Sequence, residues 1–111
     1  MKIMVTGAAG YIGSIVARDL ATEHEVVGVD MRPMPNVPDS RVMDLNSYEE
    51  IFDALDGVEG IAHLAWPMGA YEGFEPREDT PLGAGVRGVF HLLKAAVERG
   101  IERVVFQSTI N

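Results

Sequence analysis

Short apolar runs alternate along this chain with segments in which apolar residues recur at helical spacing. Most of the runs are rich in valine and isoleucine and close to continuous, which is the pattern of a strand covered on both faces. We expect one β-strand from each run. The runs lie at Lys2–Thr6, Glu25–Asp30, Arg41–Leu45, Gly60–Trp66 and Arg103–Thr109.

Helical segments separate most of these runs. In Tyr11–Ala21, apolar residues recur at the spacing of one helix face. Ser47 opens a capping-box pattern, which predicts a helix that runs through Leu55. Proline is favoured in the first turn of a helix and glycine just past its end, so Pro81–Arg99, followed by Gly100, is predicted to form a long helix.

Strands that alternate with helices predict an α/β fold with a parallel sheet. Parallel neighbours need crossover connections, and the helices of these connections cover both faces of the sheet. Such a sheet binds ligands beside the carboxyl ends of its strands, near the point where the strand order reverses. We therefore expect the functional residues in the loops that follow Thr6, Asp30, Leu45, Leu64 and Gln107.

Composition narrows the class of protein. The chain has 111 residues, enough for one domain with one core. Its net charge of −8 disfavours nucleic acid and anionic membranes as partners. The lack of cysteine excludes disulfides and thiol catalysis, and no segment resembles a signal peptide or reaches membrane-spanning length. We expect a cytoplasmic protein with a single domain over residues 1–111.

Three glycines follow the first predicted strand and open the first predicted helix, in the sequence TGAAGYIG. A side chain at Gly7 would obstruct the tight turn, one at Gly10 would block a phosphate, and one at Gly13 would hold the helix away from the sheet. Unpaired N–H groups and the positive end of the helix dipole make such a turn a site for a pyrophosphate. The spacing is G-x-x-G-x-x-G rather than G-x-G-x-x-G, so alone it also fits glycines that only permit a tight turn.

An acidic residue completes the candidate dinucleotide site. Asp30 ends the second predicted strand, where a carboxylate accepts hydrogen bonds from the hydroxyls of an adenosine ribose and repels a 2′-phosphate. NAD is therefore expected in preference to NADP. Arg32 lies close enough to weaken that preference, although a solvated loop arginine is the simpler interpretation. The chain has no Walker-type Gly-Lys-Ser/Thr sequence, which argues against a nucleotide triphosphatase.

These residues resemble the extended short-chain dehydrogenase/reductase family, which contains the NAD-dependent sugar epimerases and dehydratases. TGAAGYIG is similar to the family's glycine loop, VGVD to its ribose-binding strand end, and AHLAW to the segment beside the adenosine and pyrophosphate. GVFHLLKAAVERGIERVVFQST is similar to its long helix and the strand with the catalytic Ser or Thr, and FQSTIN looks most like the uronate dehydrogenase branch. The resemblance implies the N-terminal portion of such an enzyme, with a Rossmann-type sheet of five strands in the order 3-2-1-4-5.

The resemblance also implies NAD as the cofactor and assigns its contacts. Ser108 and Thr109 occupy the family position of the catalytic hydroxyl, and Asp44 with Leu45 matches the adenine-pocket pair. No metal site is expected, since His63 lies inside an apolar strand and is interpreted as a packed histidine. The residues expected to bind the cofactor are Gly7, Ala9, Gly10, Tyr11, Ile12, Gly13, Asp30, Met31, Arg32, Asp44, Leu45, Leu64, Ala65 and Trp66.

The family's proton-transfer pair is missing from these 111 residues. In the family, a tyrosine stands four residues before a lysine that lowers the pKa of the phenol. None of the tyrosines, at positions 11, 48 and 71, has a lysine four residues later. The chain is therefore predicted to bind NAD without catalysis of its own. Two alternatives stay open: half of an enzyme that another chain completes to act on a nucleotide-sugar or uronate, and a non-catalytic dinucleotide sensor or interaction protein.

The last predicted strand is expected to leave an apolar sheet edge with unpaired backbone groups, because no later strand follows it. Such an edge pairs readily with another strand. We therefore expect a homodimer, formed by pairing of the fifth strands or by exchange of the terminal helix and strand between two copies.

Overall fold

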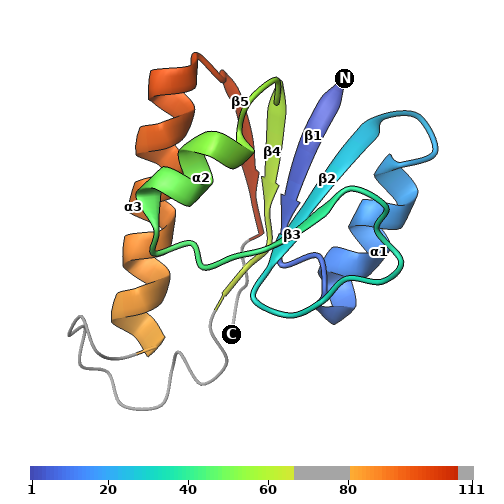
Figure 1. Ribbon diagram of the computed structural model, residues 1–111, viewed down its shortest axis with the longest axis horizontal. Coiled ribbons are helices and arrows are strands. Elements are labelled where there is room, and N and C mark those ends of the chain that lie inside the picture. The colour runs from blue at the N-terminus through green and yellow to red at the C-terminus, as the bar shows by residue number, and fades with distance from the viewer. Residues whose placement is uncertain (67–80, 108–111) are drawn as a thin grey trace.

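The computed structural model describes residues 1–66 and 81–107, except for the side chains of residues 81–84. Strands and helices follow one another in the predicted order, with β2 and β3 joined by a loop rather than by a helix (Figure 1). The elements are β1 (Lys2–Thr6), α1 (Tyr11–Leu20), β2 (Glu25–Asp30), β3 (Ser40–Val42), α2 (Tyr48–Ala54), β4 (Gly60–His63), α3 (Pro81–Arg99) and β5 (Arg103–Phe106).

The five strands form one parallel sheet in the order β3-β2-β1-β4-β5, as predicted. Thr6 at the end of β1 pairs with Val29 in β2 and with His63 in β4, and His63 pairs in turn with Phe106 in β5. These strand ends therefore lie side by side. Because β2 and β4 flank β1, the strand order reverses between β1 and β4, which is where open parallel sheets bind ligands.

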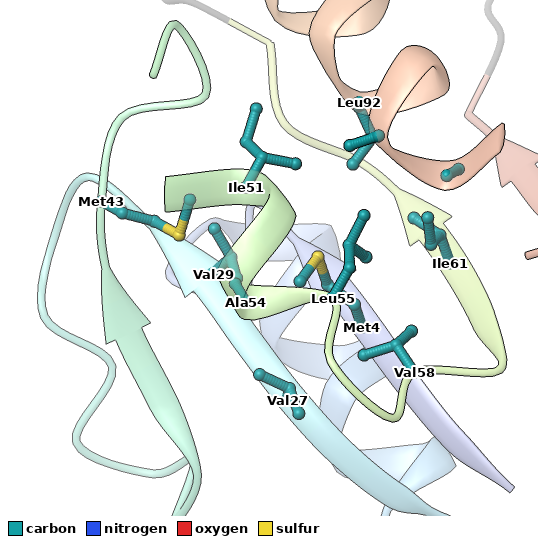
Figure 2. Close-up of a cluster of buried hydrophobic side chains, with 12 residues drawn as sticks. Met4, Val27, Val29, Met43, Ile51, Ala54, Leu55, Val58, Ile61 and Leu92 are labelled. Atoms are coloured by element: carbon teal, nitrogen blue, oxygen red, sulfur yellow. The ribbon is translucent and has the colours of Figure 1, made fainter. Parts of the chain in front are cut away.

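Helices cover both faces of the sheet, with α1 on one side and α2 and α3 on the other (Figure 1). Successive side chains of β1 point to opposite faces of the sheet. Met4 therefore packs in the cluster with α2 and α3, and Val5 packs in the cluster with α1. Figure 2 shows Ile51 of α2 and Leu55, which directly follows this helix, next to Leu92 of α3 in the larger cluster. Full burial of an aliphatic side chain contributes about 1.5–3 kcal/mol, so this cluster fixes both helices to the sheet.

Strand ends differ most from the sequence prediction. β3 covers Ser40–Val42 rather than Arg41–Leu45, and β4 stops at His63 rather than Trp66. β4 stops because its neighbour β1 ends at Thr6: the N–H of Leu64 turns to the carbonyl and hydroxyl oxygens of Thr6. β5 is described as a strand up to Phe106, and the predicted catalytic hydroxyls at positions 108 and 109 lie outside the described residues.

The helix ends follow the sequence more closely. α3 has the predicted bounds, and Gly100 follows it with a φ of +74°, as a glycine that ends a helix does. α2 has Ser47 as its N-cap residue and Leu55 as its C-cap residue. The Ser47 side chain, however, forms no capping hydrogen bond, so the predicted capping box is wrong. Glu49 and Glu50 still place negative charge at the positive end of the α2 dipole.

Candidate functional site

A pocket of about 440 Å³ lies at the carboxyl ends of the strands, around the point where the strand order reverses. The loops after β1, β2, β3 and β4 form most of its wall, and α3 contributes two glycines. The pocket therefore lies where the parallel fold predicts a ligand. Its lining residues are Gly7, Gly10, Val29, Asp30, Met31, Arg32, Met43, Asp44, Leu45, Asn46, His63, Leu64, Ala65, Trp66, Gly85 and Gly88.

Glycine is required at two positions, one in the turn after β1 and one in the first turn of α1. Gly7 has a φ of +72°, and a Cβ there would lie 2.8 Å from the Ala65 nitrogen and 2.9 Å from the Leu64 carbonyl carbon. The turn thus packs directly on the backbone that follows β4. In the first turn of α1, a Cβ at Gly13 would overlap the carbonyl oxygen of Gly7. A side chain at Gly13 would therefore collide with the glycine turn, rather than with the sheet as the sequence predicts.

The N-terminus of α1 lies at the pocket. Gly10, which lines the pocket, is the N-cap residue, and no side chain caps the helix. The N–H groups of Tyr11, Ile12 and Gly13 belong to the first helical turn and have no acceptor within the helix. With the positive end of the helix dipole, they are suited to bind a negatively charged group such as a phosphate.

The carboxylate of Asp30 joins the ends of β1 and β2. Its Oδ2 accepts the N–H of Ala9 at 3.0 Å, and its Oδ1 accepts the N–H of Arg32 at 3.0 Å. The side chain is 12% exposed and lines the pocket. Because a carboxylate has about four acceptor positions, each oxygen can accept a further hydrogen bond. Asp30 therefore holds the glycine turn in place and still offers acceptors to the hydroxyl groups of a ligand.

Thr6 and His63 form a buried pair at the pocket, and His63 is part of the pocket wall. The Thr6 hydroxyl accepts the N–H of Leu64 at 3.0 Å and that of Ala65 at 3.1 Å, and it lies 2.7 Å from Nδ1 of His63. Two accepted bonds occupy both lone pairs of the hydroxyl, so its own proton is donated to Nδ1. His63 is therefore neutral with its proton on Nε2. Burial lowers the pKa of His63 to about 4, which agrees with this state.

The structure brings most of the predicted cofactor residues together. Ala9 contacts the site through its hydrogen bond to Asp30, and Tyr11, Ile12 and Gly13 lie in the first turn of α1 rather than in the pocket wall. The binding roles of all these residues stay predictions. Those that line the pocket are Gly7, Gly10, Asp30, Met31, Arg32, Asp44, Leu45, Leu64, Ala65 and Trp66.

Sequence reasoning missed several lining residues. The most informative are Gly85 and Gly88 of α3, which were not among the predicted binding residues. A Cβ on Gly88 would lie 3.4 Å from the Cβ of Leu45, so the bare helix surface leaves this part of the pocket open. The sequence signal that could have indicated them is their separation by three residues, which places both glycines on the same face of the helix. The other lining residues that were missed are Val29, Met43, Asn46 and His63.

Comparison with family models matches residues 3–111 to the NAD dependent epimerase/dehydratase family. The chain belongs to this family. Among curated relatives, this epimerase/dehydratase chain is 30% identical over 97% of its length to an L-arabinose 1-dehydrogenase (NAD(P)(+)) of Haloferax volcanii. It is 32% identical, again over 97% of its length, to a uronate dehydrogenase of Pseudomonas syringae. The chain spans 41% and 39% of the lengths of these two relatives.

Solved structures similar to this chain include a dehydrogenase/reductase and an epimerase, each with bound NAD. A short-chain dehydrogenase/reductase superfamily protein from Agrobacterium tumefaciens with bound NAD matches 98% of this chain with a TM-score of 0.84 and 33% identity. A Thermus thermophilus UDP-glucose 4-epimerase in complex with NAD matches with a TM-score of 0.81 and 28% identity. The chain corresponds to 33% and 38% of these two proteins.

The residues at the pocket fit a nicotinamide adenine dinucleotide. A side chain at Gly7 or Gly13 would collide with neighbouring backbone, so the turn is bare at the helix N-terminus, where a pyrophosphate binds best. Asp30 supplies the acceptor that an adenosine ribose needs. In the part of the chain that the structure describes, no cluster of His, Cys, Asp or Glu could hold a metal ion. No helix in that part is long and apolar enough to cross a membrane.

Proposed function

We propose that this chain is the cofactor-binding part of an NAD-dependent oxidoreductase, epimerase or dehydratase, and that it binds NAD in preference to NADP. The observation that carries the proposal is the Asp30 carboxylate, which lies in the pocket and is held against the glycine turn by the N–H of Ala9. A fixed carboxylate at this strand end favours two ribose hydroxyls and repels a 2′-phosphate.

In the proposed complex, each part of the site has one role. The free N–H groups of the first turn of α1 bind the pyrophosphate. Asp30 accepts hydrogen bonds from the adenosine ribose, and the loop Leu64–Trp66 lines the pocket beyond β4. When bound, NAD supplies a hydride acceptor. The chain itself binds and orients the cofactor.

Isothermal titration of the protein with NAD and NADP tests this proposal. Asp30→Ala removes the ribose acceptor, so we expect the Kd for NAD to rise about tenfold or more and the preference over NADP to shrink. Asp53→Ala is the matched control, because Asp53 is an exposed acid on α2 outside the pocket lining. NAD binding that Asp30→Ala leaves unchanged, or a folded protein that binds neither dinucleotide, would overturn the proposal.

We also propose that the 111 residues bind the cofactor without turning over a substrate. The support is the lack of a tyrosine four residues before a lysine anywhere in them. Proton transfer then depends on residues outside this sequence, in the same protein or in another chain. We place the protein in the cytoplasm, where a chain without cysteine loses nothing to reduction.

A homodimer through β5 is the third part of the proposal. Within the described residues β5 pairs with β4 alone, so its outer edge has unpaired backbone groups. Val105 is 68% exposed and Phe106 43% exposed, so apolar side chains accompany this edge. A second copy would cover it either by strand pairing or by exchange of α3 and β5.

A further inference from the structure

We propose that Arg87 of α3 is a positioning residue, which orients the Asp44 carboxylate through the side chain of Asn46 and so strengthens the selection of an adenine base. The inference rests on the proposed dinucleotide site. It assigns a function to a hydrogen bond between α3 and the loop after β3, which involves neither the glycine turn nor Asp30.

The strand order places the base of the dinucleotide beside the loop after β3. The proposed pyrophosphate site lies at the first turn of α1, which follows β1, and the proposed ribose acceptor Asp30 ends β2. β3 pairs with β2 on the side away from β1, with Val42 opposite Asp30. A nucleotide that extends from α1 past Asp30 therefore places its base next to the residues that follow Val42. Asp44, Leu45 and Asn46 line the pocket there.

One oxygen of Asp44 is held by the loop, and the other is available to a ligand. Oδ1 accepts the backbone N–H of Asn46 at 2.9 Å and the side-chain N–H of the same residue, also at 2.9 Å. Among the described residues, no donor bonds to Oδ2. Asp44 is exposed, so without these two bonds the carboxylate would rotate in solvent. Held in this way, Oδ2 can accept a hydrogen bond from the exocyclic amino group of adenine.

Arg87 fixes which end of the Asn46 amide faces Asp44. Its Nε–H donates to Oδ1 of Asn46 at 3.1 Å, so Nδ2 of the amide is directed at Asp44. If the amide turned over, its NH₂ group would meet the guanidinium and its oxygen would meet the carboxylate, and both hydrogen bonds would be lost. The three groups therefore form a chain with one direction, from guanidinium to amide to carboxylate, in which each hydrogen bond strengthens the next.

Two glycines let α3 approach this loop. Gly85 and Gly88 line the pocket, and a Cβ on Gly88 would lie 3.4 Å from the Cβ of Leu45. The helix thus packs on one residue of the loop while Arg87 bonds to the next, and Arg87 is not itself among the lining residues. Apart from its charge, which acts on all dinucleotides alike, Arg87 therefore affects a ligand through the loop after β3.

Isothermal titration with NAD and with nicotinamide hypoxanthine dinucleotide tests this role. The two ligands differ at the base, where a carbonyl oxygen replaces the amino group of adenine, so the ratio of their Kd values isolates the base contact. We expect the wild-type protein to bind NAD about tenfold or more tighter, because Asp44 accepts a hydrogen bond from the amino group alone. In Arg87→Ala this preference should fall about three- to tenfold.

Further variants show whether Arg87 acts through Asn46. Asn46→Ala should also lower the preference, and adding Arg87→Ala to it should lower the preference no further, because the contact is already gone. Arg87→Lys keeps the charge and one donor, so its preference should lie between those of wild type and Arg87→Ala.

Arg99→Ala is the matched control. Arg99 lies on the same helix, and its guanidinium donates to the carbonyl oxygen of Phe52 at 2.8 and 3.1 Å, outside the pocket lining. The variant therefore removes an arginine contact of α3 without touching the loop after β3, and the preference for NAD should stay at the wild-type value.

The outcomes separate this inference from the proposed function. A wild type that binds both ligands equally, or a preference that Arg87→Ala leaves unchanged, would overturn the role of Arg87 and leave the NAD site standing. An equal fall in Arg99→Ala, or an effect of Arg87→Ala that adds to that of Asn46→Ala, would do the same. A folded protein that binds neither NAD nor NADP would overturn both proposals.

Discussion

The Thr6 hydroxyl shows how one small side chain can organise a pocket without forming part of its wall. It accepts hydrogen bonds from the N–H groups of Leu64 and Ala65 and donates one to Nδ1 of His63. These bonds join the end of β1 to the end of β4 and the loop that follows it. Gly7 packs on this same stretch of backbone. The glycine turn and the loop after β4 are therefore held together by a network that needs His63 to remain neutral.

We expect acid to destabilise this network. Burial lowers the pKa of His63 from 6.5 to about 4, so the unfolded chain binds this proton at a higher pH than the folded chain does. The contribution of His63 to stability is complete above pH 6.5 and is lost as the pH falls toward 4, by about 3 kcal/mol in total. Urea unfolding at several pH values in this range measures how steeply the free energy of unfolding falls with pH.

His63→Asn is the comparison for that measurement. The asparagine carbonyl can still accept the Thr6 proton but does not titrate. The variant should lose stability overall, because the ring contact with Phe106 is gone, yet its stability should fall less steeply with acid. Parallel curves for the two proteins would show that His63 does not titrate in this range, since the remaining histidines and carboxylates are common to both.

At the scale of elements, two helical glycines are expected to respond in opposite directions to alanine. Gly13→Ala places a Cβ on the Gly7 carbonyl oxygen, so α1 must move from the turn, at a cost of about 2 kcal/mol or more. In Gly88→Ala the new Cβ has ordinary contacts, 3.4 Å from the Leu45 Cβ and 4.0 Å from its carbonyl oxygen, so the variant should gain about 0.5–1 kcal/mol of helix stability. Thermal unfolding of both variants measures the difference. Equal effects would contradict it.

The positions of helices and strands are also the part of the structure that the sequence predicts best. The bounds of β1, β2 and α3 follow from apolar patterning, proline and glycine, which act within a few residues of the chain. The end of β4 at His63 was not predictable in this way, because it depends on where the neighbouring strand β1 stops. The role of Gly88 in opening the pocket likewise depends on Leu45, which is distant in sequence.

At the scale of the whole molecule, the sheet order decides what the pocket contains. Residues after β1, β2 and β4 meet because β1 lies between the other two strands. Alternation of strands and helices predicts that such loops share one end of the sheet, and the resemblance implied the order. The sequence therefore predicts which end of the sheet holds the pocket, and it predicts Asp30 there. It does not predict the hydrogen bond between Asp30 and Ala9 or the packing of Gly7 on Ala65, because these contacts join residues that are distant in sequence.

The proposed homodimer can be tested at this same scale. Val105→Lys places a charge in the middle of β5, where edge strands commonly carry lysine to prevent pairing, so we expect the dimer Kd to rise about tenfold or more. Val97→Lys is the control, because Val97 is 78% exposed on α3 and the variant adds the same charge away from the strand. Sedimentation velocity at tens of micromolar protein distinguishes the cases. A monomeric wild type would contradict the dimer, and a dimer broken only by Val97→Lys would move the interface from β5 to α3.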